Sequence, residues 1–302
     1  MGPTATARWR AWSTDVELTI TDASLLDAAA DLCRDVMEEI DAACSRYRID
    51  SELSRFTRSG ATRTRVSAGL GELLRDALAA AELTDGLVDP TLGSRLAQLD
   101  GPTLGVPASV SRPICWTDVT LEDGVLTAPP GTAFDLGAIG KASAAERVVR
   151  TIEGALGAEM GVLVGIGGDI ASSIAHPEGG WRILVQDSPG DPADSVALTA
   201  GAAIATSSTQ HRRYRAGGRL VAHILDPRSL DPVQSPWRTV TCAAVTCVEA
   251  NAYSTAAVIL GHEAVPWLAA RGVPARLVDQ QYRVTTTEGW PSRPAPREPA
   301  GV

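Results

Sequence analysis

The sequence predicts a fold of the α+β class, and three observations lead to this prediction. Helical and strand-like segments interleave along the chain, but without the regular strand–helix alternation of a doubly wound parallel sheet. Strand-like segments dominate after residue 180. The 302 residues are 44% hydrophobic, which supplies enough material to bury the core of one large domain.

The first half of the chain begins with a strand and a long helix. Residues 16–20 alternate between apolar and polar side chains, and the apolar residues of 24–43 recur at helical spacing. A second helix is predicted over 69–83, ending at Asp85-Gly86, where glycine can adopt the left-handed conformation of a helix stop. Residues 116–128 have the pattern of a β-hairpin that turns at Asp123-Gly124.

The second half contains the remaining elements. A helical pattern covers 138–156, and a short apolar strand at 161–166 runs into Gly167-Gly168. Further strands are predicted at 181–185, 195–198, 220–225 and 240–245, and helices at 249–260 and 263–270. Because prolines recur from Pro291 onward, 290–302 is predicted to be a disordered tail that follows a domain spanning 1–289.

Charge and composition exclude several classes of partner. The formal net charge is −9 and no block of Lys and Arg compensates it, so nucleic acid is not an expected partner. The N-terminus lacks the apolar run of a signal peptide, and no segment reaches the ~18 apolar residues that span a membrane. A cytoplasmic protein without a membrane segment is expected. The five cysteines lack metal-site or redox-motif spacing, which favours buried, reduced thiols.

A glycine-rich segment at 165–170 is similar to a dinucleotide-binding loop, but Ile170 replaces the last glycine of that fingerprint. The Rossmann interpretation is therefore disfavoured. The simpler interpretation is that Gly167 and Gly168 let the backbone approach a ligand or a neighbouring strand closely.

A polar helix entrance is expected at 135–141, where small residues are flanked by Asp135 and Lys141. Exposed backbone amides at a helix N-terminus suit an anionic or polar ligand. The alternative is that Asp135 only caps the helix and that Lys141 is a solvated surface charge.

Hydroxyl and imidazole groups follow later in the chain. Residues 206–209 offer four adjacent hydroxyls, and His211 and two arginines follow shortly after, so these groups either converge on phosphate oxygens or form only a polar strand end. His223 lies within the strand expected at 220–225, where an imidazole serves either proton transfer or a structural role.

Asn251 and Thr255 form an i, i+4 pair that places two oxygens on one face of the helix expected at 249–260. Such oxygens suit Mg²⁺, which completes its shell with water and substrate phosphate. The alternative is that Asn251 is only the N-cap of this helix and that Thr255 is a helix-facing hydroxyl.

In this order along the chain, these segments resemble the FAD:protein FMN transferase family, also called the ApbE family, over nearly the whole sequence. Residues 45–56, with an aromatic residue and a serine–glutamate pair, are similar to the early motif that leads into the family's flavin site. The family's later motifs are matched by residues 84–91, 135–141, 165–170, 205–208, 223–228 and 251–255 of this chain.

The resemblance implies one two-lobed domain of mixed or antiparallel sheets and flanking helices, with FAD in the cleft between the lobes. It also implies that the FMN half of FAD moves to a Thr or Ser hydroxyl of an acceptor protein, with AMP released and Mg²⁺ required. His223 would accept the proton. FAD would be bound by Trp12, Tyr47, Leu87, Val88, Asp89, Asp135, Lys141, Gly167, Gly168, Thr206, Ser207 and Ile224, and the metal by the backbone carbonyl of Ala138 and by Asn251, Ser254 and Thr255.

The chain departs from the family's pattern at three places. Asn251 stands where the family has Asp, Ala138 where it has Gly, and Trp12 begins a segment where Met-Gly-Thr is common. The change to Asn251 removes a full negative charge from the expected metal shell but leaves a neutral oxygen. Two alternatives therefore stay open: an FAD pyrophosphatase that uses water as nucleophile, and a non-catalytic FAD-binding protein.

Overall fold

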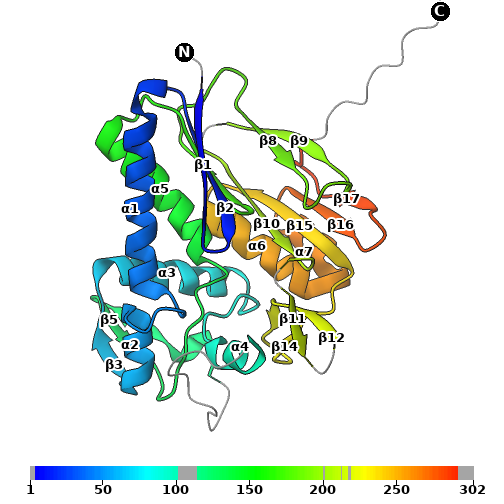
Figure 1. Cartoon of the computed structure of the whole chain (residues 1–302). Helices are drawn as coiled ribbons and strands as arrows, with labels where there is room; N and C mark the ends of the chain where they lie inside the picture. The colour runs from blue at the N-terminus through cyan, green and yellow to red at the C-terminus, as the bar shows by residue number, and fades with distance from the viewer. Residues whose placement is uncertain (1–3, 101–113, 200, 212, 217–218, 292–302) are drawn as a thin grey trace, which may run out of the picture.

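The computed structural model describes residues 4–100, 114–199, 201–211, 213–216 and 219–291, and its centre is an eight-stranded sheet (Figure 1). Every strand pairing in these ranges is antiparallel, which confirms the α+β prediction and leaves no parallel unit of the Rossmann type. In spatial order the strands are β1 (Ala5–Ala11), β2 (Thr14–Ile20), β6 (Val162–Ile166), β7 (Asp169–Ser172), β10 (Ala203–Ser208), β15 (Trp237–Ala244), β16 (Ala275–Asp279) and β17 (Val284–Thr286).

Helices cover one face of this sheet. Strand β6 shows the reason, because Val162, Val164 and Ile166 alternate with less buried residues and are fully buried on the helical side. Against that face pack α1 (Leu26–Cys44), α5 (Gly140–Leu156) and α6 (Cys247–Leu260), with α3 (Ala68–Leu83) and α7 (Ala264–Ala270) beside them (Figure 1). Short 3₁₀ turns precede α1 and α7, at Ala23–Leu25 and Gly261–Glu263.

A smaller lobe lies below the large sheet in Figure 1. It contains α2 (Glu52–Ser59), α4 (Gly93–Asp100), a 3₁₀ turn (Trp116–Asp118) and a three-stranded sheet of β3 (Arg63–Arg65), β5 (Val125–Thr127) and β4 (Thr120–Glu122). The β4–β5 turn is at Asp123-Gly124, where both φ angles are positive. That turn is the one expected from the sequence, because a two-residue hairpin loop of this type needs two positive φ angles.

The other face of the sheet is covered in part by the hairpin of β8 (Trp181–Val185) and β9 (Asp194–Leu198). Its own apolar cluster includes Trp181, Ile204 of β10 and Trp290. Trp290 is the first residue of the expected tail, and it is buried and donates a hydrogen bond from Nε1 to Asp194 at 3.0 Å. Residues 292–302 of that tail lie outside the described residues.

Two further small hairpins complete the fold, β11 (Arg213–Ala216) with β12 (Arg219–Ala222) and β13 (Leu225–Asp226) with β14 (Asp231–Pro232). They confirm the strand expected at 220–225 only in part, because 220–222 belong to β12 and residue 225 begins the separate strand β13. The chain changes its pairing partner between β12 and β13, so His223 lies in the connection and not within a strand. In the described part of the chain, no helix combines the length and the apolar composition needed to cross a bilayer.

Candidate active site

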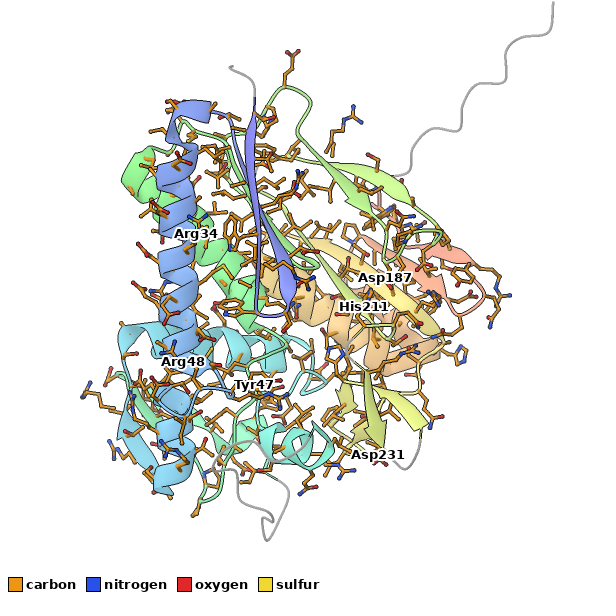
Figure 2. The ribbon with its side chains drawn as sticks, viewed as in Figure 1. Arg34, Tyr47, Arg48, Asp187, His211 and Asp231 are labelled. Atoms are coloured by element: carbon orange, nitrogen blue, oxygen red, sulfur yellow. The ribbon has the colours of Figure 1, made fainter. Side chains whose placement is uncertain are left out.

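A cavity of about 1130 Å³ opens where the large sheet, the smaller lobe and the β8–β9 hairpin meet. Its volume is at the upper end of the range for small-molecule pockets. In Figure 2, Tyr47 lies near the lower end of α1, whereas Asp187 and His211 lie on the side of the β8–β9 hairpin. All three residues line the cavity.

The structure brings nearly all of the residues singled out in the sequence to this cavity. The lining residues among them are Trp12, Tyr47, Leu87, Val88, Asp89, Asp135, Ala138, Lys141, Gly167, Gly168, Thr206, Ser207, His223, Ile224, Asn251 and Thr255. Ser254 is the exception among the described residues, because it is fully buried behind Ser207, with which it shares a 2.9 Å hydrogen bond. Ser254 therefore supports the wall of the cavity and does not face its interior.

One wall is made by two tight hairpin turns at the end of the sheet. Trp12 and Ser13 join β1 to β2 and have φ angles of 49° and 61°, the left-handed region that a two-residue hairpin requires. Such a conformation is uncommon for a side chain as large as Trp, and it places the ring at the cavity. Gly167 lies beside this turn, where a Cβ atom would come within 2.7 Å of the Thr14 hydroxyl.

An exposed aromatic side chain, Tyr47, follows the end of α1 and lines the cavity, and we call it the Tyr47 platform. Tyr47 is 72% exposed, and the guanidinium of Arg46 lies 4.7 Å from its ring centroid and donates to its hydroxyl at 2.7 Å. Arg46 also approaches Asp135, with Nε 3.9 Å from Oδ1. The sequence analysis missed Arg46, although its position next to the aromatic residue was visible. The Tyr47 ring, in contact with Arg46, therefore lies at the cavity.

Two aspartates at the cavity, Asp89 and Asp135, accept hydrogen bonds from backbone amides near the smaller lobe. Asp89 accepts hydrogen bonds from the amide of Thr91 at 2.8 Å and from the amide of Trp116 at 3.1 Å. Asp135 accepts from the amide of Gly137 at 3.1 Å. Helix α5 begins only at Gly140, and its N-cap is Ile139, so the alternative that Asp135 caps the helix is wrong.

A polar centre lies beneath these walls, and we define it as Lys141, Asp169, Ser207, Asn251 and Thr255. Asp169 is fully buried and forms an ion pair with Lys141, so Lys141 is not the solvated charge of the alternative interpretation. Asn251 donates from Nδ2 to Asp169 Oδ1 at 2.7 Å, and Ser207 shares a 2.9 Å hydrogen bond with Thr255. The sequence analysis assigned no role to Asp169.

Asn251 is not the N-cap of its helix. The N-cap of α6 is Thr246, which forms a capping box with Glu249, and Asn251 is a buried residue within the helix. Its Oδ1 atom is buried and has no hydrogen-bond partner. A buried acceptor without a donor is costly unless another group satisfies it.

This unsatisfied oxygen bears on the expected metal. Within the described ranges, no group of three or more His, Cys, Asp or Glu side chains is arranged to hold an ion. The available donors are oxygens of three residues that line the cavity: Oδ1 of Asn251, the hydroxyl of Thr255 and the backbone carbonyl of Ala138. Such a set fits a hard cation such as Mg²⁺ that takes few protein ligands, and the orphaned oxygen is what favours it.

The titratable groups at the cavity include a thiol, a carboxyl group and two imidazoles. Burial raises the pKa of the Cys44 thiol to about 12, so this thiol stays neutral and is not a nucleophile near pH 7. Burial also raises the pKa of Asp187, which lies 3.1 Å from Nε2 of His211. His211 and His223 are the two imidazoles that line the cavity in the described part of the chain.

The adjacent hydroxyls of β10 do not all point to the same face of the sheet. Because successive strand residues point to opposite faces, Ser207 faces α6 and bonds to Thr255, whereas Thr206 bonds across the sheet to Thr241 at 2.9 Å. Of the residues expected to join them, Arg212 lies outside the described residues.

The fold and the cavity together define a class: an α+β protein whose cleft combines an exposed aromatic ring with a buried polar centre of oxygen donors. The chain belongs to the ApbE family, whose sequence model matches residues 12–277. This match confirms the resemblance on which the sequence analysis relied.

Individual relatives agree with this assignment. The FAD:protein FMN transferase of Salmonella typhimurium is 28% identical over 259 residues, covering 77% of this chain and 72% of the relative. The protein of the same name from Escherichia coli strain K12 is 26% identical over 261 residues, covering 78% and 72%. Among solved structures, the ApbE protein of Thermotoga maritima superposes with a TM-score of 0.81 at 25% identity, covering 95% of this chain and 97% of that one.

The flavin transferase ApbE from Vibrio cholerae superposes with a TM-score of 0.78 at 21% identity, covering 95% of this chain and 98% of that one. At this identity the likeness shows the fold alone. It confirms the two-lobed α+β architecture.

Proposed function

We propose that this protein is an FAD:protein FMN transferase, which moves FMN from FAD to a Thr or Ser hydroxyl of an acceptor protein and releases AMP. The observation that carries the proposal is the convergence of the polar centre, the Tyr47 platform and His223 on one cavity. FAD has a ring system and a diphosphate. The Tyr47 platform suits the ring system, and the polar centre suits the diphosphate. Family membership supports the same activity.

In the proposed reaction, the acceptor hydroxyl attacks the phosphorus on the FMN side, a P–O bond to AMP breaks, and a phosphodiester forms. His223 takes the proton from the attacking hydroxyl. Lys141 and Asp135 position the nucleotide, and the hairpin turn at Trp12 closes one side. Asn251, Thr255 and the backbone carbonyl of Ala138 would hold a Mg²⁺ ion, which would supply neutralisation of charge on the phosphate oxygens.

The experiment that tests this proposal is an incubation of the purified protein with FAD and Mg²⁺, with and without a candidate acceptor protein. We expect AMP release that depends on the acceptor, together with a covalent flavin on the acceptor that survives denaturation. Flavin fluorescence in a denaturing gel and chromatography of AMP are the two measurements. Removal of the metal with EDTA is expected to abolish both products, because the phosphate oxygens would then lose the divalent cation that the polar centre is proposed to hold.

The same experiment separates the two alternatives. AMP and free FMN without an acceptor would identify an FAD pyrophosphatase, since only the nucleophile differs. Saturable FAD binding with no AMP under any condition would identify a binding protein. No saturable FAD binding at micromolar concentration would contradict the proposal as a whole.

Replacing Tyr47 with Ala is expected to weaken FAD binding by roughly 2- to 10-fold, the range for the loss of one aromatic stacking contact. The ring is exposed and already stacked on Arg46, so its loss removes contact with the ligand and little of the core. Fluorescence titration of FAD measures the effect.

Tyr282 provides a matched control for this variant. It is 49% exposed and stacks on Arg238 at 4.5 Å, but it does not line the cavity. Tyr282→Ala is expected to leave the FAD affinity unchanged. Equal effects of the two substitutions would exclude a specific platform at Tyr47.

A further inference from the structure

We infer that Asp169 is a positioning residue, which fixes the side-chain amide of Asn251 so that its oxygen faces the cavity. This inference rests on the proposed function, because it concerns the metal that the polar centre is proposed to hold. It adds a residue to which the sequence analysis gave no role. It also explains how an amide can stand where the family has a carboxylate.

The position of Asp169 in the sheet places its carboxylate under two helices. It is the first residue of β7 and lies opposite Ile166 of β6 and Ala205 of β10, both fully buried on the face that the helices cover. Lys141 reaches it from the first turn of α5, and Asn251 reaches it from α6. Asp169 therefore joins the two helices that frame the polar centre.

The chemistry of the two side chains dictates the orientation of the amide. A carboxylate only accepts hydrogen bonds, whereas an amide has a donor end and an acceptor end. Nδ2 of Asn251 therefore turns toward Asp169, at 2.7 Å, and Oδ1 must point the other way. Oδ1 is the buried acceptor that has no partner within the protein.

Lys141 compensates the charge of the buried Asp169 carboxylate. A fully buried carboxylate is strongly destabilising unless a cation compensates it, and the ammonium of Lys141 supplies that charge. Since Lys141 carries only donors, it cannot take the place of Asp169 as the acceptor for the Asn251 amide. The three residues thus form one unit, in which Lys141 and Asn251 both donate to Asp169.

This unit changes the expected effect of restoring the family's Asp at position 251. Ligand charge alone predicts that Asn251→Asp tightens metal binding. In this chain the new carboxylate would lie against Asp169, and two acceptor-only anions would repel each other at this distance. Tighter binding is expected only when Asp169 is changed as well.

A double-mutant cycle tests the inference with Mn²⁺ as the probe, measured by the loss of the free-ion signal in electron paramagnetic resonance. The four proteins are the wild type, Asp169→Asn, Asn251→Asp and the double variant. We expect Asp169→Asn to weaken Mn²⁺ binding roughly 10-fold, because the Asn251 amide is then free to turn. Asn251→Asp alone is expected to give no tighter binding than the wild type.

The double variant is expected to bind Mn²⁺ about 10-fold more tightly than Asn251→Asp alone, because the amide at position 169 can donate to the carboxylate at 251. Urea unfolding of the same four proteins without metal gives a second readout. Asn251→Asp is expected to lower the unfolding midpoint, and the double variant is expected to recover it.

Asp76→Asn is the matched control. Asp76 is a half-buried carboxylate that accepts a hydrogen bond from Ser143 of α5, but it lies outside the cavity, so Mn²⁺ binding should not change. Mn²⁺ binding in the wild type with additive effects of the two substitutions would overturn the inference alone. Absence of Mn²⁺ binding in all four proteins would overturn the metal assignment of the proposed function, and the inference with it.

Discussion

Replacement of His223 with Ala is expected to slow acceptor-dependent AMP release by roughly 10² to 10⁴-fold, the usual range for removal of a general base. FAD affinity should change little, because the Tyr47 ring and the polar centre that are proposed to hold the nucleotide remain intact. The imidazole is the side chain best matched to proton transfer near neutral pH, and His223 lines the cavity. Single-turnover AMP release and FAD titration measure the two quantities separately.

His211 is the control that makes this prediction specific. It lines the same cavity, but its Nε2 lies 3.1 Å from the buried carboxylate of Asp187, and the imidazole is mostly exposed. We expect His211→Ala to retain most of the activity. A large loss in His211→Ala with an unchanged rate in His223→Ala would transfer the role of base to His211.

Replacement of Lys141 with Met is expected to lower the free energy of unfolding by about 3 kcal/mol, the low end of the range for breaking a buried ion pair from one side. The low end applies because the Lys141 side chain is 21% exposed, whereas that of Asp169 is fully buried. The substitution retains most of the apolar stem and removes only the charge, so Asp169 is left uncompensated. Urea denaturation at pH 7 measures the change.

The double variant Lys141→Met/Asp169→Asn tests the cause of this loss. Without a buried charge to compensate, it should recover most of the stability that Lys141→Met loses. A loss of less than about 0.5 kcal/mol in Lys141→Met would place the pair among exposed ion pairs of little energetic value. An unrecovered loss in the double variant would attribute the effect to packing.

The local pattern of the sequence was sufficient for most helices and several strands. The helix predicted over 249–260 is α6, Cys247–Leu260, and the strand predicted at 181–185 is β8, Trp181–Val185. Alternation in β8 reports directly which face of the strand is buried, whereas α6 is buried on nearly all sides and was predicted from its helical sequence pattern alone. The local pattern missed α2, whose buried residues are only Leu53, Ser54 and Phe56, and edge strand β1, whose residues are half-buried or exposed.

The order of motifs along the chain was also sufficient for the family and for the set of residues that line the cavity. It could not show which of these residues touch. Thr206 and Ser207 are neighbours in the chain but lie on opposite faces of β10, and His223 falls at a change of pairing partner. These outcomes depend on strand register, which is set by pairing with distant segments.

The sequence by itself determined the fold class, the family and most of the proposed site residues that gather at the cavity, because periodicity is a local property and the order of the motifs is read directly along the chain. Only the tertiary structure decided the role of Asp169. Its contacts with Lys141 and Asn251 join residues 28 and 82 positions apart. Such contacts arise only when α5 and α6 pack on the sheet, and Asn251 then donates from Nδ2 to Asp169 and turns its oxygen away from that carboxylate.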